Sequence, residues 1–166
     1  MLYYTANFSL DLCYTSGMKK TYYSYETFKN DTKTLANICK KENFDTIIAL
    51  ARGGMSLAQA LAEALDIRDV QTIQTQLYDG SSKRKEITVI DNTHVKDNAK
   101  VLIVDDIADS GETLKEVLKH LHNNYPNSFF KTATLFYKHT SCCTPDFWVK
   151  EATQWVEFFW EVDFSL

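Results

Sequence analysis

The chain has 166 residues, of which 45% are hydrophobic, and its formal net charge is −4 at pH 7. This length supports one domain with a full core and is too short for two well-built ones. The negative charge argues against a partner held mainly by attraction to a phosphate backbone, so we expect no nucleic-acid partner. No apolar run approaches the roughly 18 residues of a membrane span, and we expect no integral membrane segment.

The four cysteines show no spacing typical of a disulfide framework. We therefore expect a reducing, cytoplasmic setting. Residues 1–17 lack a basic segment ahead of an apolar core, so they do not resemble a signal peptide. They are interpreted either as an extension upstream of an alternative start at Met18 or as an edge strand over 7–12, and the domain proper as residues 18–166.

Apolar spacing predicts an alternation of helices and strands without repeats or linkers, which indicates a single α/β domain. In chain order, the expected elements are a helix carrying Phe28, Leu35, Ile38 and Cys39 behind the cap Ser24, a strand over 46–50, a helix carrying Met55, Leu57, Leu61, Ala62 and Leu65, a weak strand over 87–90, a strand over 100–104, a helix from about Thr113 carrying Leu114, Val117, Leu118 and Leu121, and strands over 131–137 and 147–149.

The most informative segment joins the apolar run Val101–Val104 to a helix through an acidic pair and a short turn. Asp105 and Asp106 follow the run directly, at the end of a strand where ligands of α/β sheets collect. In the turn 109–113, backbone N–H groups, two hydroxyls and a helix N-terminus can all face one anion. The alternative is a solvated strand end with Asp109 as a helix cap, but too many positions coincide for that reading to be preferred.

The pattern Asp-Asp-x-x-Asp-Ser-Gly-x-Thr resembles the signature of the type I phosphoribosyltransferases. That resemblance implies an α/β fold with a mainly parallel central sheet flanked by helices and a small hood formed by the chain ends. It also implies phosphoribosyl pyrophosphate as substrate and Mg²⁺ as cofactor. The residues implied to bind phosphoribosyl pyrophosphate are Arg52, Gly53, Gly54, Lys85, Asp105, Asp106, Asp109, Ser110, Gly111, Glu112 and Thr113.

Arg52, Gly53 and Gly54 follow the strand expected over 46–50. Glycines permit close backbone approach, and the arginine fork suits phosphate oxygens, although such a turn alone is more often a tight connection. The resemblance implies that this turn holds pyrophosphate and that the Ala51-Arg52 peptide is cis. It further implies that the polar segment 77–86 closes over the site through Lys85 or its neighbour Arg84; a solvated hairpin tip is the other interpretation.

Within this family the chain is most similar to the bacterial xanthine-guanine enzymes. The resemblance implies that Asp109 is the catalytic residue beside purine N7, that Trp155 stacks on the base and that the Val156 backbone reads its edge. An ammonium at Lys138 has no acceptor and can donate to the oxygen of a 6-oxopurine. Asp106 and Glu161 would hold the metal. Relatives commonly have Asp at the position of Glu161, and Glu112 places a carboxylate in the phosphate turn.

The resemblance implies purine salvage, with guanine, xanthine or hypoxanthine as the base, and family analogy suggests a homodimer or homotetramer. Three alternatives remain: an enzyme preferring hypoxanthine, a pyrimidine phosphoribosyltransferase, which Lys138 and Trp155 disfavour, and a regulator that binds phosphoribosyl pyrophosphate. Such regulators need a basic face or an added DNA-binding module, and the sequence shows neither.

Overall fold

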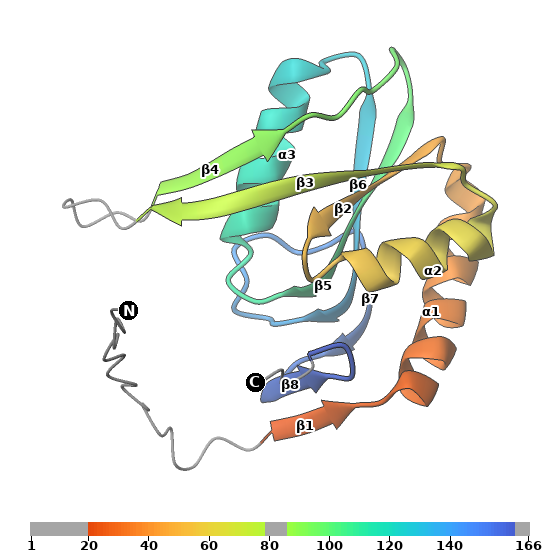
Figure 1. The fold of residues 1–166 in the computed structure, drawn as a ribbon, viewed down its shortest axis with the longest axis vertical. Coiled ribbons are helices and arrows are strands. Elements are labelled where there is room, and N and C mark those ends of the chain that lie inside the picture. The colour runs from red at the N-terminus through yellow and green to blue at the C-terminus, as the bar shows by residue number, and fades with distance from the viewer. Residues whose placement is uncertain (1–19, 79–85, 162–166) are drawn as a thin grey trace, which may run out of the picture.

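The structure is a computed structural model that describes residues 20–78 and 86–161 (Figure 1). Residues 1–17 and Lys85, both subjects of predictions above, lie outside the described residues. None of the helices among the described residues is both long enough and apolar enough to cross a membrane.

The elements follow the predicted alternation. The strands are β1 (Lys20–Tyr23), β2 (Thr46–Ala51), β3 (Asp69–Tyr78), β4 (Glu86–Asp91), β5 (Lys100–Ala108), β6 (Phe129–Tyr137), β7 (Phe147–Glu151) and β8 (Trp155–Phe158), and the helices are α1 (Tyr25–Cys39), α2 (Met55–Leu65) and α3 (Glu112–Asn124), with a short 3₁₀ turn η1 (Lys40–Glu42).

Six strands form the main sheet in the order β4-β3-β2-β5-β6-β7, in which only β3 and β4 pair antiparallel. The parallel pair β1 and β8 forms a separate two-stranded sheet from the two ends of the described chain, below the main sheet in the view of Figure 1. We call this pair the hood. The predicted α/β fold, with a mainly parallel sheet and a hood from the chain ends, is confirmed.

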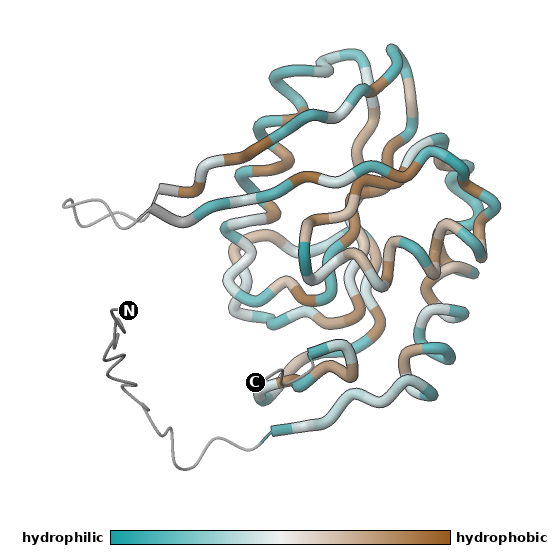
Figure 2. The backbone as a smooth tube through the Cα atoms, in the orientation of Figure 1, coloured by the Kyte–Doolittle hydropathy of each residue, from teal (hydrophilic) through white to brown (hydrophobic). Residues whose placement is uncertain are grey.

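Helices on both faces explain why residues 47–50 of β2 and 101–104 of β5 are all apolar. Ile47 and Ala49 pack in the cluster that contains side chains of α1 and α2, whereas Ile48 and Leu50 pack in the cluster that contains side chains of α3. A strand covered on both sides reads as a continuous hydrophobic run. Figure 2 shows this hydrophobic colour concentrated in the central strands.

The first helix begins as predicted, because the Ser24 hydroxyl accepts a hydrogen bond from the Thr27 backbone N–H at 3.2 Å. Its predicted core face is partly wrong: Ile38 is 44% exposed, while Asp31 is buried at 8%. The buried stripe of the helix therefore includes a charged residue in place of an apolar one. Met55, expected to support the core from the second helix, is likewise exposed.

Three strands, β1, β3 and β8, had no counterpart among the predicted elements. β3 alternates Gln and Thr with few apolar residues, and Ile73 is its one residue in the buried core among those whose side chains the structure describes. β1 is similarly polar. A strand at or near a sheet edge buries little surface, so its hydrophobic signal is weak.

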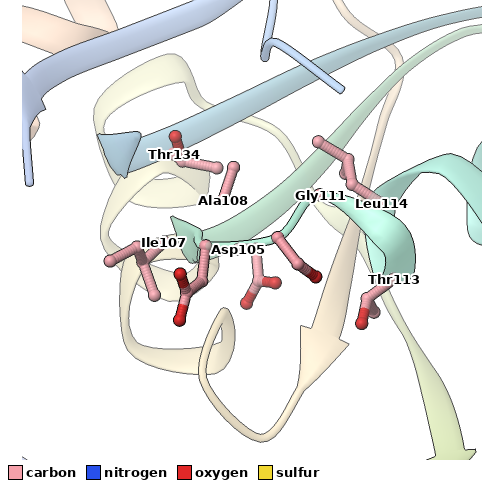
Figure 3. Close-up of a pocket in the computed structure, with 9 residues that line it drawn as sticks. Asp105, Ile107, Ala108, Gly111, Thr113, Leu114 and Thr134 are labelled. Carbon is pink, nitrogen blue, oxygen red and sulfur yellow. The ribbon is translucent and has the colours of Figure 1, made fainter. Parts of the chain in front are cut away.

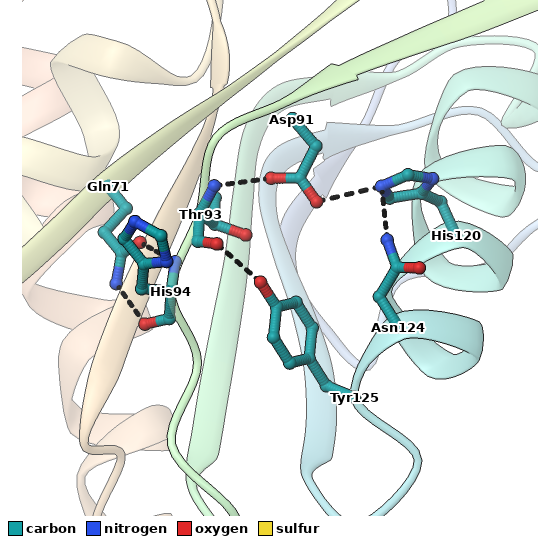
Figure 4. A network of polar contacts seen from close by, with 7 residues as sticks. All are labelled: Gln71, Asp91, Thr93, His94, His120, Asn124 and Tyr125. Atoms are coloured by element: carbon teal, nitrogen blue, oxygen red, sulfur yellow. Dashed lines mark hydrogen bonds and ion pairs between the residues drawn. The ribbon is translucent and has the colours of Figure 1, made fainter.

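A polar network holds the segment after β4 against α3 (Figure 4). One oxygen of Asp91 accepts from the Thr93 backbone N–H at 2.7 Å, and the other lies 2.8 Å from Nε2 of His120. Burial by itself would raise the pKa of Asp91, but these hydrogen bonds and the nearby imidazole lower it below its usual value. Gln71 on β3 also bonds both backbone groups of His94, which closes the network on its other side.

Candidate active site

Three neighbouring parallel strands end at one edge of the sheet, and each is followed by residues singled out in the sequence. β2 leads into the turn Arg52–Gly54, β5 carries the acidic pair and leads into the turn 109–111, and β6 is followed by Lys138. Because carboxyl ends of parallel strands form the ligand-binding edge of α/β sheets, this convergence defines the candidate site.

The environment of Asp105 and Asp106 disfavours ionisation of both carboxyl groups at once. Burial and the neighbouring Asp106 raise the pKa of Asp105 well above its usual value. Burial is also the main reason that the pKa of Asp106 rises from 3.8 to about 6, and the charge of Glu161 adds to the shift. The Asp106 backbone N–H donates to Asp105 Oδ1 at 3.0 Å. The site thus concentrates negative charge that a bound cation or hydroxyl donors would offset.

The glycine turn packs directly on this pair. A Cβ atom at Gly53 would lie 2.6 Å from Asp106 Oδ2, and one at Gly54 would collide with the carbonyl oxygen of Val104. Glycine is therefore required here for close contact with β5. The Ala51–Arg52 peptide is cis, which confirms that prediction, and the Arg52 side chain is exposed beside the turn.

The turn after β5 forms a small pocket of about 90 Å³ (Figure 3). Its lining consists of Asp105, Ile107, Ala108, Asp109, Ser110, Gly111, Thr113, Leu114 and Thr134. Ligand pockets that enclose whole small molecules measure roughly 300–1,000 Å³, so this one suits a group of phosphate size. Gly111 is the N-cap of α3 at φ +77° and brings no capping side chain, and Thr113 and Leu114 in the first turn of the helix line the pocket.

The Glu112 side chain is exposed, so the carboxylate that departs from the expected phosphate turn points to solvent. Ser110 Oγ accepts from the Glu112 backbone N–H at 3.3 Å. The Glu112 carboxylate thus stays clear of the turn, and the Glu112 backbone N–H is engaged by the Ser110 hydroxyl.

Lys138 and Asp109 are brought together by the parallel pairing of β5 and β6. Lys138 Nζ lies 2.6 Å from Asp109 Oδ1, with the two side chains 30% and 59% exposed. The Lys138 backbone N–H also donates to the Ala108 carbonyl at 3.1 Å. A charged donor and a carboxylate thus stand together beside the phosphate-sized pocket.

Two of the predicted base-facing residues, Trp155 and Val156, lie in the hood. Trp155 is half exposed, whereas the Val156 side chain is buried in the core, which leaves only its backbone for recognition of a ligand. Glu161 follows β8, and its carboxylate accepts weakly from the Phe158 backbone N–H at 3.4 Å. The charge of Glu161 contributes to the raised pKa of Asp106, so the two carboxylates lie within electrostatic range of each other.

Sequence reasoning missed two features of the site. Thr134 lines the phosphate-sized pocket, and its fully buried hydroxyl has no hydrogen-bond partner among the described residues. The Ser141–Cys143 turn supports the phosphate turn: the Cys142 N–H donates to the Ser110 carbonyl at 2.8 Å, and a Cβ at Gly111 would meet Ser141 and Cys143. Only the β5–β6 register could have revealed the Thr134 position.

The donor set fits a divalent cation. Asp105, Asp106 and Glu161 supply the carboxylate oxygens that Mg²⁺ prefers, although no cluster of three metal-binding side chains is preformed among the described residues. Mg²⁺ usually takes one or two protein carboxylates together with substrate phosphates and water. Two or three carboxylates without a complete protein ligand set are therefore compatible with such a cation.

Residues 20–165 match the phosphoribosyl transferase domain, and the chain belongs to this family. It is 34% identical over 149 residues to the xanthine-guanine phosphoribosyltransferase of Desulfotalea psychrophila, with 87% of this chain and 89% of the relative covered. The same enzyme of Idiomarina loihiensis is 29% identical over 148 residues, with 87% and 88% covered.

Solved structures agree with this grouping. The Helicobacter pylori xanthine-guanine-hypoxanthine phosphoribosyltransferase superposes with a TM-score of 0.80 at 34% identity, covering 87% of this chain and 95% of that one. A purine phosphoribosyltransferase of Pyrococcus horikoshii gives 0.79 at 28% identity, covering 88% and 96%. The chain is therefore a phosphoribosyltransferase similar to enzymes that act on purines.

Proposed function

We propose that this protein transfers the 5-phosphoribosyl group from phosphoribosyl pyrophosphate to N9 of a 6-oxopurine, in purine salvage. The observation that carries the proposal is the contact of Lys138 with Asp109 beside the phosphate-sized pocket. It joins a donor suited to the purine O6 with a carboxylate suited to the N7 side of the same ring. An ammonium has no acceptor for the amino group of adenine.

In the proposed reaction, the bond from ribose C1 to pyrophosphate breaks and the bond from C1 to N9 forms. Asp109 takes the proton that the purine loses. Asp105 and Asp106 accept hydrogen bonds from the ribose 3′- and 2′-hydroxyls, and the turn Ser110–Thr113 binds the 5′-phosphate. Both interactions hold the ribose in line while C1 moves between its two partners.

Arg52, Gly53 and Gly54 bind the pyrophosphate, and Lys85, from outside the described residues, adds a second cation in this proposal. Trp155 stacks on the purine while the Val156 backbone contacts its edge. Asp106 and Glu161 would hold Mg²⁺, which when bound neutralises charge on the leaving pyrophosphate. In line with the family resemblance, we propose that the protein is a homodimer or homotetramer. Its molar mass, measured by light scattering after size-exclusion chromatography, would test this.

A base panel tests the substrate class. We would measure kcat/KM with phosphoribosyl pyrophosphate, Mg²⁺ and guanine, xanthine, hypoxanthine, adenine, uracil or orotate. The kcat/KM for adenine should be at least about 10⁴-fold lower than that for the accepted 6-oxopurines, because the adenine amino group and the Lys138 ammonium are both hydrogen-bond donors. Turnover of adenine or a pyrimidine as fast as guanine would refute the purine assignment. Absence of turnover with all six bases would favour a regulator.

Lys138→Met tests the residue that selects the base, because methionine keeps an unbranched side chain and removes the donor. We expect kcat/KM for 6-oxopurines to fall about 10- to 100-fold, the range for a hydrogen bond to a charged group. Lys119→Met on the exposed face of α3 is the matched control. Equal effects of the two substitutions would remove Lys138 from the base site.

A further inference from the structure

A polar network outside the candidate site joins three separate elements. Asp31 on α1 is 8% exposed, and its Oδ2 atom accepts from the Tyr23 hydroxyl of β1 at 2.7 Å and from Lys150 Nζ of β7 at 2.6 Å. The Lys150 ammonium also lies 5.6 Å from the centroid of the Tyr23 ring. One carboxylate oxygen thus links the hood to α1 and to the main sheet.

Stability alone is a weak explanation for this network. Placing a carboxylate on the buried face of a helix carries a desolvation penalty, and well-packed apolar replacements of buried ion pairs are often neutral or stabilising. Hydrogen bonds are directional, however, whereas ring packing tolerates sliding. Burial and the Asp31 carboxylate raise the pKa of the Tyr23 hydroxyl, so it remains a donor at all physiological pH values.

Tyr23 is one of the residues that attach the hood to the rest of the molecule, together with Phe158, whose ring lies 5.8 Å from that of Phe136 on β6. The Tyr23 ring makes edge contacts with Phe158 of β8 at 5.6 Å and with Phe136 of β6 at 5.0 Å between centroids. Its carbonyl accepts from the Phe159 N–H at 3.1 Å, and in the register of the hood it stands opposite Phe158. Figure 1 shows β1 and β8 side by side, with α1 continuing from β1. Because the Tyr23 ring contacts both Phe158 and Phe136, the place of β8 relative to β6 depends in part on where Tyr23 is held.

We propose that Tyr23, Asp31 and Lys150 form an anchor that positions the purine-binding residues of β8 relative to Lys138 at the end of β6. The inference rests on the proposed function. Trp155 and Val156 would face the base from the hood, and Lys138 would face it from the main sheet, so the anchor sets the width of the base site. The phosphate turn lies between β5 and α3, and no described hydrogen bond or ion pair joins it to the anchor. These three are positioning residues that touch no substrate.

The test is a triple variant, Tyr23→Phe with Asp31→Leu and Lys150→Met, which replaces every polar atom of the anchor by apolar groups of similar size. We expect a Tm equal to or above that of the wild type. The KM for the 6-oxopurine should rise about 10-fold or more, while the KM for phosphoribosyl pyrophosphate stays within about twofold. Hydrogen exchange of the β8 amides should become faster in the variant.

Tyr23→Phe alone removes one hydrogen bond and keeps the ring, and should raise the base KM about two- to fivefold. Tyr25→Phe is the matched control, because Tyr25 is an exposed neighbour whose ring contacts Phe159 just after β8. If the triple variant does not fold, the comparison of Tyr23→Phe with Tyr25→Phe tests the inference in its place. A base KM unchanged by Tyr23→Phe, or one raised equally by Tyr25→Phe, overturns the inference.

A triple variant in which both KM values rise together and the Tm falls would also overturn it, since that pattern reports a structural role. Failure of the proposed function looks different. The wild type would then turn over none of the six bases, and β8 amide exchange would decide whether the anchor holds the hood.

Discussion

Asp106 provides a quantitative prediction, because its environment opposes its ionisation. Its pKa in the folded protein is about 6, against 3.8 for the unperturbed group. A difference of about two units at about 1.4 kcal/mol each corresponds to about 3 kcal/mol. Since the folded pKa is the higher one, this stability is fully present below pH 3.8 and is lost as the pH rises through about 6.

Asp106→Asn cannot ionise and should avoid that loss. Without divalent cations, we expect the variant to be more stable than the wild type by about 3 kcal/mol at pH 7.5 and by about 1 kcal/mol at pH 4.5. Near neutral pH, this corresponds to a Tm increase of roughly 6–12 °C for a chain of this size. Turnover should nevertheless fall, because the variant loses a carboxylate that the proposed reaction uses.

Chemical denaturation at the two pH values measures the difference, and Asp97→Asn in an exposed loop is the control for a simple change of net charge. The reasoning fails if Asp106→Asn is no more stable than the wild type at pH 7.5. It also fails if the gain is the same at both pH values, since burial of an ionised carboxylate would then not be its cause.

Three further predictions address other parts of the site. Asp109→Asn should keep its circular dichroism spectrum and lose about 10²- to 10⁴-fold in kcat, and retention of half the activity would remove its proton-transfer role. Arg52→Ala should raise the KM for phosphoribosyl pyrophosphate and leave the Kd of the product mononucleotide unchanged; equal weakening of both would indicate a structural role instead. Gly111→Ala combines about 1–2 kcal/mol of left-handed backbone strain with a collision against the supporting turn. It should lower the Tm and weaken phosphate binding, whereas Asn98→Ala, at φ 60°, should lower only the Tm, by roughly 2–4 °C.

Local sequence was sufficient for most elements of the fold. The cap at Ser24, the apolar periods of the helices and the uninterrupted run before Asp105 are signals carried by neighbouring residues, and each appears in the structure near its predicted place. The polar strand β3, which lies next to the edge strand β4, was missed because few of its side chains reach the core. The placement of Asp105 and Asp106 at a ligand-binding edge also followed from the sequence, since it depends only on the order of strand, turn and helix.

The tertiary structure alone decided which distant groups meet. Whether Lys138 reaches Asp109, whether Thr134 enters the phosphate-sized pocket and whether Lys150 pairs with Asp31 all depend on strand order and register. Strand order and register are set by how whole helices pack against the strands. They produce no hydrophobic periodicity in the sequence around these residues. The strongly raised pKa of Asp106 has the same origin, because the burial and the Glu161 charge that cause it come from segments far along the chain.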